Sequence, residues 1–133
     1  MKPPHPSMHR LLRPHTQPPR HITGPAKRLR VDQTGVLTTA ATVARTAAAA
    51  ALAMYKNLPN YRNNWLRLGF TEDEIEANDS RFVDGVVAWG TADQIRTRMQ
   101  EHTDAGADHV CIQALNPESP FAPDMAALEA LAP

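Results

Sequence analysis

The pattern of apolar and polar residues divides the chain into a polar, proline-rich start and a longer part with regular periodicity. From Gly35 onward the first predicted element is a short strand at residues 36–39, where two apolar residues precede two β-branched threonines. Residues 40–57 are rich in alanine and predict a helix. Its apolar face is formed by Val43, Ala47, Ala51 and Met54.

Further helices are marked by capping signals and by apolar residues at helical spacing. Thr71 with Glu74, and Thr91 with Gln94, have the form of capping boxes, which start helices. Residues 80–90 also predict a helix, one that ends at Gly90. The remaining helices are expected over residues 61–68, 72–78, 92–105 and 124–131.

The stretch Val-Cys-Ile-Gln-Ala-Leu at residues 110–115 predicts a second strand. Its nearly continuous apolar character favours burial on both faces, as in a parallel sheet. Cys111, inside this run, is expected to be a buried and inert thiol. The sequence therefore predicts an α/β fold with two strands and five or six helices.

Composition separates the first thirty residues from the rest. Residues 1–30 hold seven Lys and Arg, seven prolines, four histidines and no acid, whereas residues 31–133 carry a net charge of about minus seven. Such a start buries too little apolar surface to order itself, so residues 1–30 are predicted to be a disordered basic tail and residues 31–133 a folded domain. The histidines of the tail match no metal-ligand spacing, and no metal site is predicted.

Several classes of protein are disfavoured by simple counts. The single cysteine, Cys111, excludes an internal disulfide and favours a reducing compartment. No stretch has the roughly 20 apolar residues of a membrane helix, and no secretory signal follows the start. The protein is predicted to be cytoplasmic, with no membrane partner.

Four sequence segments, in order, resemble the luciferase-like monooxygenase superfamily and its deazaflavin (coenzyme F-420)-dependent oxidoreductases. These segments are Val36-Leu37-Thr38-Thr39, then 53–72 with its Leu-Pro-Asn-Tyr-Arg-Asn-Asn core, then Gly-Thr-Ala-Asp-Gln-Ile at 90–95, and finally Asp-Ala-Gly-Ala-Asp-His-Val-Cys-Ile-Gln at 104–113. The resemblance covers about residues 31–131.

This resemblance implies a (β/α)8 TIM barrel, of which the chain corresponds to a C-terminal fragment. It implies hydride transfer between F-420, with FMN as the alternative, and an organic small-molecule substrate. The family's cofactor contacts lie mostly on earlier barrel strands, so activity of this chain alone is not expected to be complete. Self-association is expected to cover the unpaired sheet edge.

Candidate site residues follow from the rule that barrel chemistry lies at the carboxyl ends of the strands. Thr38, Thr39 and Gln113 are candidates for cofactor contact, against the alternatives that Thr39 caps the next helix and that Gln113 only packs. The substrate-pocket candidates are Tyr61, Arg62, Asn63 and Asn64. For these four the alternative is that Tyr61 belongs to the core and that the other three are solvated. No catalytic residue is assigned.

Two other functions remain open from the sequence. A binding protein acting through its basic tail would contact nucleic acid, although the tail lacks the aromatic residues that stack on bases. A non-catalytic remnant of the oxidoreductase shares every sequence feature with the enzyme.

Overall fold

A computed structural model describes residues 28–133, apart from the side chains of residues 120 and 121. The predicted disordered tail lies outside these residues except for 28–30, and the first strand begins at Arg30. The elements, in chain order, are β1 (Arg30–Leu37), α2 (Ala41–Ala53), α3 (Pro59–Arg67), α4 (Glu72–Glu76), α5 (Ser80–Val86), β2 (Val87–Gly90), α6 (Ala92–Asp104), β3 (His109–Asn116), β4 (Ser119–Pro123) and α7 (Met125–Leu131).

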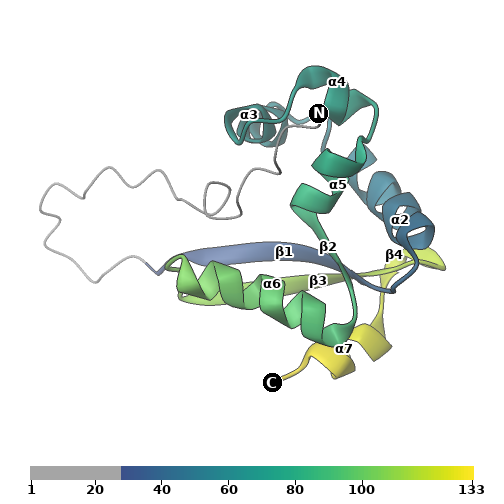
Figure 1. Ribbon diagram of the computed structural model, residues 1–133, viewed down its shortest axis with the longest axis vertical. Coiled ribbons are helices and arrows are strands. Elements are labelled where there is room, and N and C mark those ends of the chain that lie inside the picture. The colour runs from purple at the N-terminus through teal and green to yellow at the C-terminus, as the bar shows by residue number, and fades with distance from the viewer. Residues whose placement is uncertain (1–27) are drawn as a thin grey trace, which may run out of the picture.

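The four strands form one mixed sheet in the order β2-β1-β3-β4. β1 is parallel to β2 and β3, whereas β4 folds back antiparallel on the end of β3. Helices cover both faces: α6 and α7 lie on one side of the sheet and α2 to α5 on the other (Figure 1). The predicted α/β class is therefore confirmed, with six helices but four strands instead of two in the described part of the chain.

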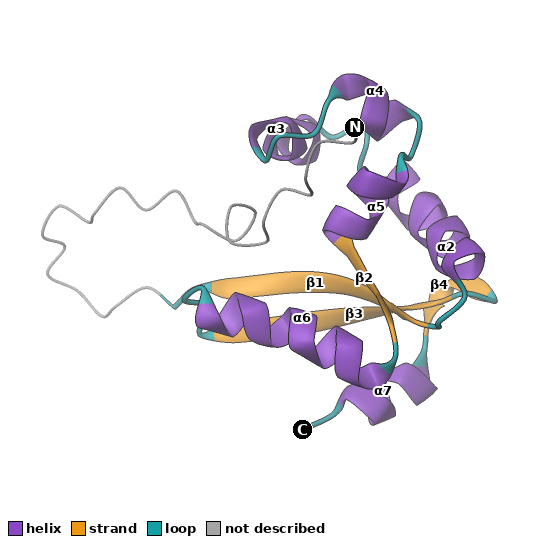
Figure 2. Ribbon diagram, in the orientation of Figure 1, coloured by secondary structure: helices purple, strands orange, loops and turns teal. Residues whose placement is uncertain are grey.

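Each face of the sheet has its own hydrophobic cluster. Val36 and Leu115 point into the larger cluster, with the aromatic side chains of α3 and α5, whereas Leu37 and Ile112 pack against the smaller cluster under α6. This alternation follows from the two-residue period of a strand. Figure 2 shows the resulting three layers, helix, sheet and helix.

The strand order differs from that of a barrel, in which each strand lies beside the next one along the chain. Here β1 lies between β2 and β3, and crossovers on opposite faces connect the strands. A sheet with only three parallel strands has too few strands to close into a barrel. Placing the eight-residue β1 at its centre gives this strand a hydrogen-bonded neighbour on both sides.

Two predicted elements differ in kind from those observed. Residues 87–90 form strand β2 instead of the end of a helix, since α5 stops at Val86 and β-branched Val87 suits an extended conformation. Residues 119–123 form β4, where only a proline-broken connection was expected. The helix predicted to reach residue 57 ends at Ala53, and the extended Leu58 precedes Pro59, which begins α3.

The prediction that β3 is buried on both faces is wrong. Cys111 and Gln113 are exposed, because α2 to α5 cover only the carboxyl half of the sheet on that side. The expected buried thiol is therefore an exposed one. The outer edge of β3 before Leu115 also pairs with no strand of residues 28–133. Self-association through this edge stays a prediction.

Both predicted capping boxes are confirmed. The Thr71 hydroxyl accepts a hydrogen bond from the Glu74 amide, and the Thr91 hydroxyl accepts one from the Gln94 amide. In each box the side chain of Glu74 or Gln94 in turn accepts a hydrogen bond from the backbone amide of the threonine. Thr91 is thus a structural cap at the start of α6, as its sequence context predicts.

Candidate functional site

A cavity of about 300 Å³ lies between the middle of strands β1 and β3 and the helices α2 and α3. Its lining combines aromatic rings, apolar side chains, amides and one carboxylate. The residues that line it are Asp32, Thr34, Ala51, Leu52, Tyr55, Tyr61, Asn64, Trp65, Val86 and Gln113.

The aromatic wall of the cavity comes from α3 and the turn before it. Pro59 at the first position of α3 fixes the start of the helix. Tyr61 and Trp65 are four residues apart and therefore share one face of α3. Their ring centroids are 6.1 Å apart, and the Tyr55 ring lies 4.6 Å from that of Tyr61.

The hydrophobic core holds this wall in place. Trp65 is 5% exposed and makes an edge contact with the fully buried ring of Phe82, at 5.0 Å between centroids. Phe82 in turn meets Phe70 in a second edge contact at 5.4 Å. Because Trp65 is anchored in this aromatic cluster, the face that it presents to the cavity is fixed.

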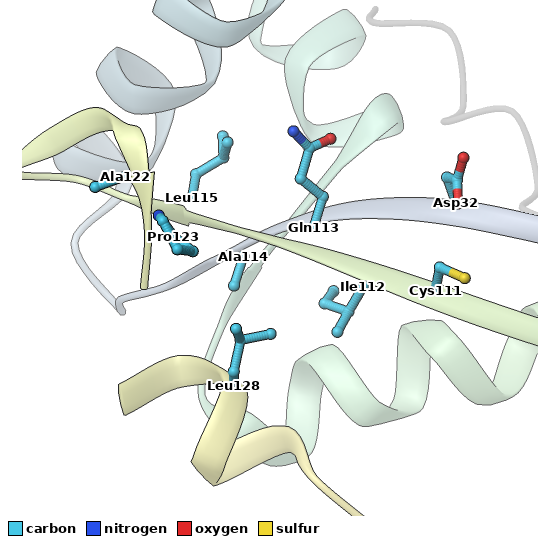
Figure 3. Close-up of a pocket in the computed structure, with 9 residues that line it drawn as sticks. All are labelled: Asp32, Cys111, Ile112, Gln113, Ala114, Leu115, Ala122, Pro123 and Leu128. Atoms are coloured by element: carbon cyan, nitrogen blue, oxygen red, sulfur yellow. The ribbon is translucent and has the colours of Figure 1, made fainter. Parts of the chain in front are cut away.

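The polar side of the cavity comes from neighbouring positions on β1 and β3. Thr34 pairs in register with Gln113, and Asp32 lies two residues earlier on the same face of β1. Figure 3 shows Asp32, Cys111, Gln113 and Leu115 on one side of the sheet, with Ile112 and Ala114 pointing toward Leu128 on the other. The parallel pairing of β1 and β3 is thus what brings Asp32 and Gln113 together.

The polar side chains around the cavity are not used by the fold. Within residues 28–133 the side chains of Asp32, Asn64 and Gln113 form no hydrogen bond or ion pair. Asn64 and Gln113 are exposed as well. An amide offers both a donor and an acceptor, so the site can bind either kind of polar group on a ligand.

Three of the seven residues predicted for a site therefore meet in one place. Tyr61 and Asn64 from the predicted substrate group lie with Gln113 from the predicted cofactor group. Tyr61 is 41% exposed, so its assignment to the core is not correct, whereas Trp65 is a core residue.

The two threonines after β1 do not reach the cavity. The Thr38 hydroxyl accepts a hydrogen bond from the Ala40 amide at 3.2 Å, and Thr39 is exposed. The residue that caps α2 is Ala40, without a side-chain bond, so the expected cap by Thr39 is also wrong.

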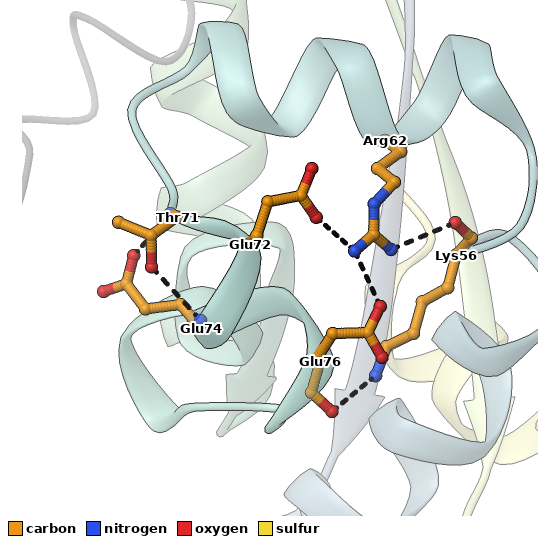
Figure 4. Close-up of polar contacts among 6 residues, drawn as sticks. All are labelled: Lys56, Arg62, Thr71, Glu72, Glu74 and Glu76. Carbon is orange, nitrogen blue, oxygen red and sulfur yellow. Dashed lines mark hydrogen bonds and ion pairs between the residues drawn. The ribbon is translucent and has the colours of Figure 1, made fainter.

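Arg62 turns away from the cavity into a network of charges (Figure 4). It binds Glu72 and, at 2.6 Å, Glu76, and it also donates to the backbone carbonyl of Lys56. The hydrogen bonds to the two carboxylates raise the pKa of Arg62 above its ordinary value. Asn63 is exposed and does not line the cavity. Arg62 therefore ties α3 to α4, Asn63 faces solvent, and neither forms part of the pocket.

Sequence reasoning missed Asp32, Thr34 and Tyr55. Asp32 and Thr34 lie in a run of three polar residues, Asp-Gln-Thr, that precedes Gly35 and shows no apolar alternation. No local pattern therefore extends the predicted strand at 36–39 back to these residues. Tyr55 lies in the turn between α2 and α3, and only the fold places it beside Tyr61.

Two further searches of the described residues gave no site. No group of three His, Cys, Asp or Glu side chains within residues 28–133 is placed to hold a metal ion. No helix in this part of the chain is long and apolar enough to cross a membrane.

Comparisons with known proteins add no relative to this description. No protein-family model matches the sequence, and neither a curated protein nor a solved structure matches it. The residues of the cavity are therefore the basis for any functional assignment.

Proposed function

We propose that this chain is the substrate-binding part of a luciferase-like oxidoreductase, the class that transfers hydride between deazaflavin coenzyme F-420, or FMN, and an organic substrate. The observation that carries the proposal is the cavity in which Tyr61, Asn64 and Gln113 meet. Tyr61 and Asn64 come from one segment that resembles this class. Gln113 is the last residue of another such segment, 104–113, and lies within β3.

The lining suits a small organic molecule. Ligand sites are typically apolar and aromatic concavities with a few polar groups that fix orientation. Here Tyr61 and Trp65 offer ring surface for packing, while the Asn64 and Gln113 amides offer donors and acceptors that the fold leaves unused. The chain's own residues would thus bind and orient a substrate.

The same lining does not fit the cofactor. F-420 and FMN carry phosphate groups, which proteins hold with Arg, Lys or backbone amides at a helix start. Among residues 28–133 no Lys, Arg or His lines the cavity, and the one charged residue of this part that does, Asp32, is an acid. The proposal therefore assigns the cavity to the substrate and derives no part of the hydride transfer from it.

In the barrel that the resemblance implies, the strand predicted at residues 36–39 lies beside the last strand, predicted at 110–115. These predicted strands correspond to β1 and β3, which pair in parallel, whereas β2 is an additional strand on the other edge of β1. We propose that residues 31–131 correspond to the C-terminal strands and helices of such a barrel. In this chain, the pairing of β3 with β1 is what forms the cavity.

Titration of the ¹⁵N-labelled full chain with benzyl alcohol, followed by NMR, tests the proposal. Saturable shifts of the amide signals of Tyr61, Asn64 and Gln113 are expected, with the far-UV circular dichroism of the folded protein unchanged. A folded chain without these shifts would contradict binding in the cavity.

A parallel fluorescence titration with oxidised and reduced F-420 tests the cofactor assignment. Because none of the residues 28–133 that line the cavity is cationic, we expect no saturable change at micromolar protein. Cofactor binding that shifts the same three amides would overturn the assignment of the cavity to the substrate.

A further inference from the structure

The charge of the cavity is set by one residue. Of the lining residues in the described range 28–133, Asp32 is the only Asp or Glu, and no Lys, Arg or His of that range accompanies it. Its side chain is exposed and forms no ion pair or hydrogen bond within residues 28–133. A carboxylate without a partner beside a partly enclosed space attracts a positive charge into that space.

The cations of the surrounding elements are used elsewhere. Arg45 on α2 binds Asp84 at 2.8 Å, and Arg62 on α3 binds Glu72 and Glu76. Arg67, the last residue of α3, is exposed and does not line the cavity. Lys56 donates to the backbone carbonyl of Glu76.

The cation nearest to Asp32 along β1 is Arg30, two residues earlier on the same strand face. Arg30 lines a separate hollow with Arg28, Asp108 and His109, and it is not part of the cavity wall. The described residues thus supply no counter-charge inside the cavity.

The aromatic wall adds a second attraction for a cation. Tyr55, Tyr61 and Trp65 line the same cavity, with neighbouring centroids 4.6 and 6.1 Å apart. A cation within about 6 Å of such rings is attracted by their negative faces. Rings and carboxylate on the walls of one space of about 300 Å³ therefore act on the same bound molecule.

We infer that the cavity selects a small organic cation, an amine or quaternary ammonium group attached to an apolar or aromatic body. The cationic group lies between Asp32 and the tyrosines, and the body packs against Trp65 and Leu52. Where the cation carries N–H groups, the amide oxygens of Asn64 and Gln113 accept them. This inference rests on the proposed substrate site and names the class of its ligand.

The test compares three probes of similar shape but different charge, by calorimetric titration of the full chain. They are benzyltrimethylammonium, its neutral isostere neopentylbenzene, and the anion phenylacetate. We expect the cation to bind at least about ten times more tightly than the neutral isostere, and the anion to show no saturable binding.

Two variants with the same change of charge locate the effect. Asp32→Asn is expected to weaken binding of the cation about tenfold, and to change binding of neopentylbenzene by less than about twofold. Asp73→Asn is the control, because Asp73 is an exposed acid in the first turn of α4 outside the cavity, and it should leave both affinities unchanged.

The outcomes separate this inference from the function on which it rests. Equal binding of cation and neutral isostere, or an unchanged affinity in Asp32→Asn, would overturn selection of a cation and leave the substrate site standing. Tightest binding of phenylacetate would overturn it as well. A folded chain that binds none of the probes would contradict both the inference and the substrate site.

Discussion

Polar side chains on the two faces of β1 differ in their burial and in their hydrogen bonding. Gln33 points under α6 and is 4% exposed, and both ends of its amide are bonded. Its nitrogen donates to the carbonyls of Thr34 and Val86, at 2.8 and 3.2 Å, and its oxygen lies 2.7 Å from Nε2 of His102. On the other face Asp32 is exposed, and its carboxylate has no hydrogen-bond partner among residues 28–133.

This difference separates polar residues that serve the fold from polar residues that remain available to a ligand. A buried amide must find its partners within the protein, because an unsatisfied one costs roughly 1–3 kcal/mol. Asp32 and Gln113 face solvent, so water can satisfy their polar groups. Without side-chain partners among residues 28–133 they stay available to a ligand, whereas the bonds of Gln33 stabilise the fold.

The largest effect is expected when the aromatic support of the cavity face is removed. Phe82 is fully buried against Trp65 and Phe70, so Phe82→Ala should lower the free energy of unfolding by about 3–5 kcal/mol. It should also weaken binding of benzyltrimethylammonium by the folded protein, because Trp65 loses its anchor. Urea unfolding and calorimetry measure the two effects.

Ile95→Ala is the matched core change on the opposite face, since Ile95 is 1% exposed in the cluster under α6. It should cost about 2–5 kcal/mol of stability and leave the affinity of the folded fraction unchanged. Equal losses of affinity in Phe82→Ala and Ile95→Ala would contradict a separate role for the two faces.

The same substitution on the two faces compares them directly. Gln33→Leu removes the partner of buried His102 and should destabilise the protein by about 2–3 kcal/mol, whereas Gln113→Leu should change stability by less than about 0.5 kcal/mol. Urea unfolding of both variants at neutral pH gives the values. Similar losses in the two would show that the open face also holds the fold.

Acidification should act on the closed face through His102. Burial, and then the charge of Arg98, lower the pKa of His102 below its ordinary value of about 6.5. The unfolded chain therefore binds the proton more readily. Stability should be unaffected above about pH 6.5 and should fall below it, by at most about 1.4 kcal/mol per pH unit.

Chemical unfolding at a series of pH values measures this slope between about pH 7 and pH 5.5. His102→Gln should remove the slope, while His109→Gln, at an exposed position at the start of β3, should keep it. A slope that persists in His102→Gln would assign the pH dependence to other groups.

The smallest effect distinguishes two neighbouring asparagines on α3. Asn64 lines the cavity and Asn63 does not, although both are exposed. Asn64→Ala should weaken binding of benzylammonium by about 1 kcal/mol, roughly fivefold, through loss of one hydrogen bond. Calorimetry with Asn63→Ala as control should show no change, and an equal effect of the two would place the ligand elsewhere.

Local signals in the sequence identified most of the helices and three residues of the cavity. The capping boxes at Thr71 and Thr91 predict helix starts because they depend only on residues three apart. Tyr61, Asn64 and Gln113 could be selected because polar groups at a helix break or a strand end are typical of sites.

What the sequence left open depends on which strands become neighbours. The short strand β2 follows α5 without a break, and its one valine, Val87, continues the apolar spacing of the helix before it. The exposure of Cys111 is decided by where the helices stop covering the sheet, which no local pattern records. Asp32 became a site residue only when β1 paired with β3.

The central position of β1 also determines the order of events while the protein is made. Just before the two strands begin, the backbone amide of Leu29 donates a hydrogen bond to the carboxylate of Asp108, 79 residues later in the chain. At about 5–20 residues per second, a ribosome needs roughly 4–16 seconds to cover that distance. Both edges of β1 lack a strand until β2 has emerged, one edge still lacks a strand until β3 has emerged, and the cavity can form only then.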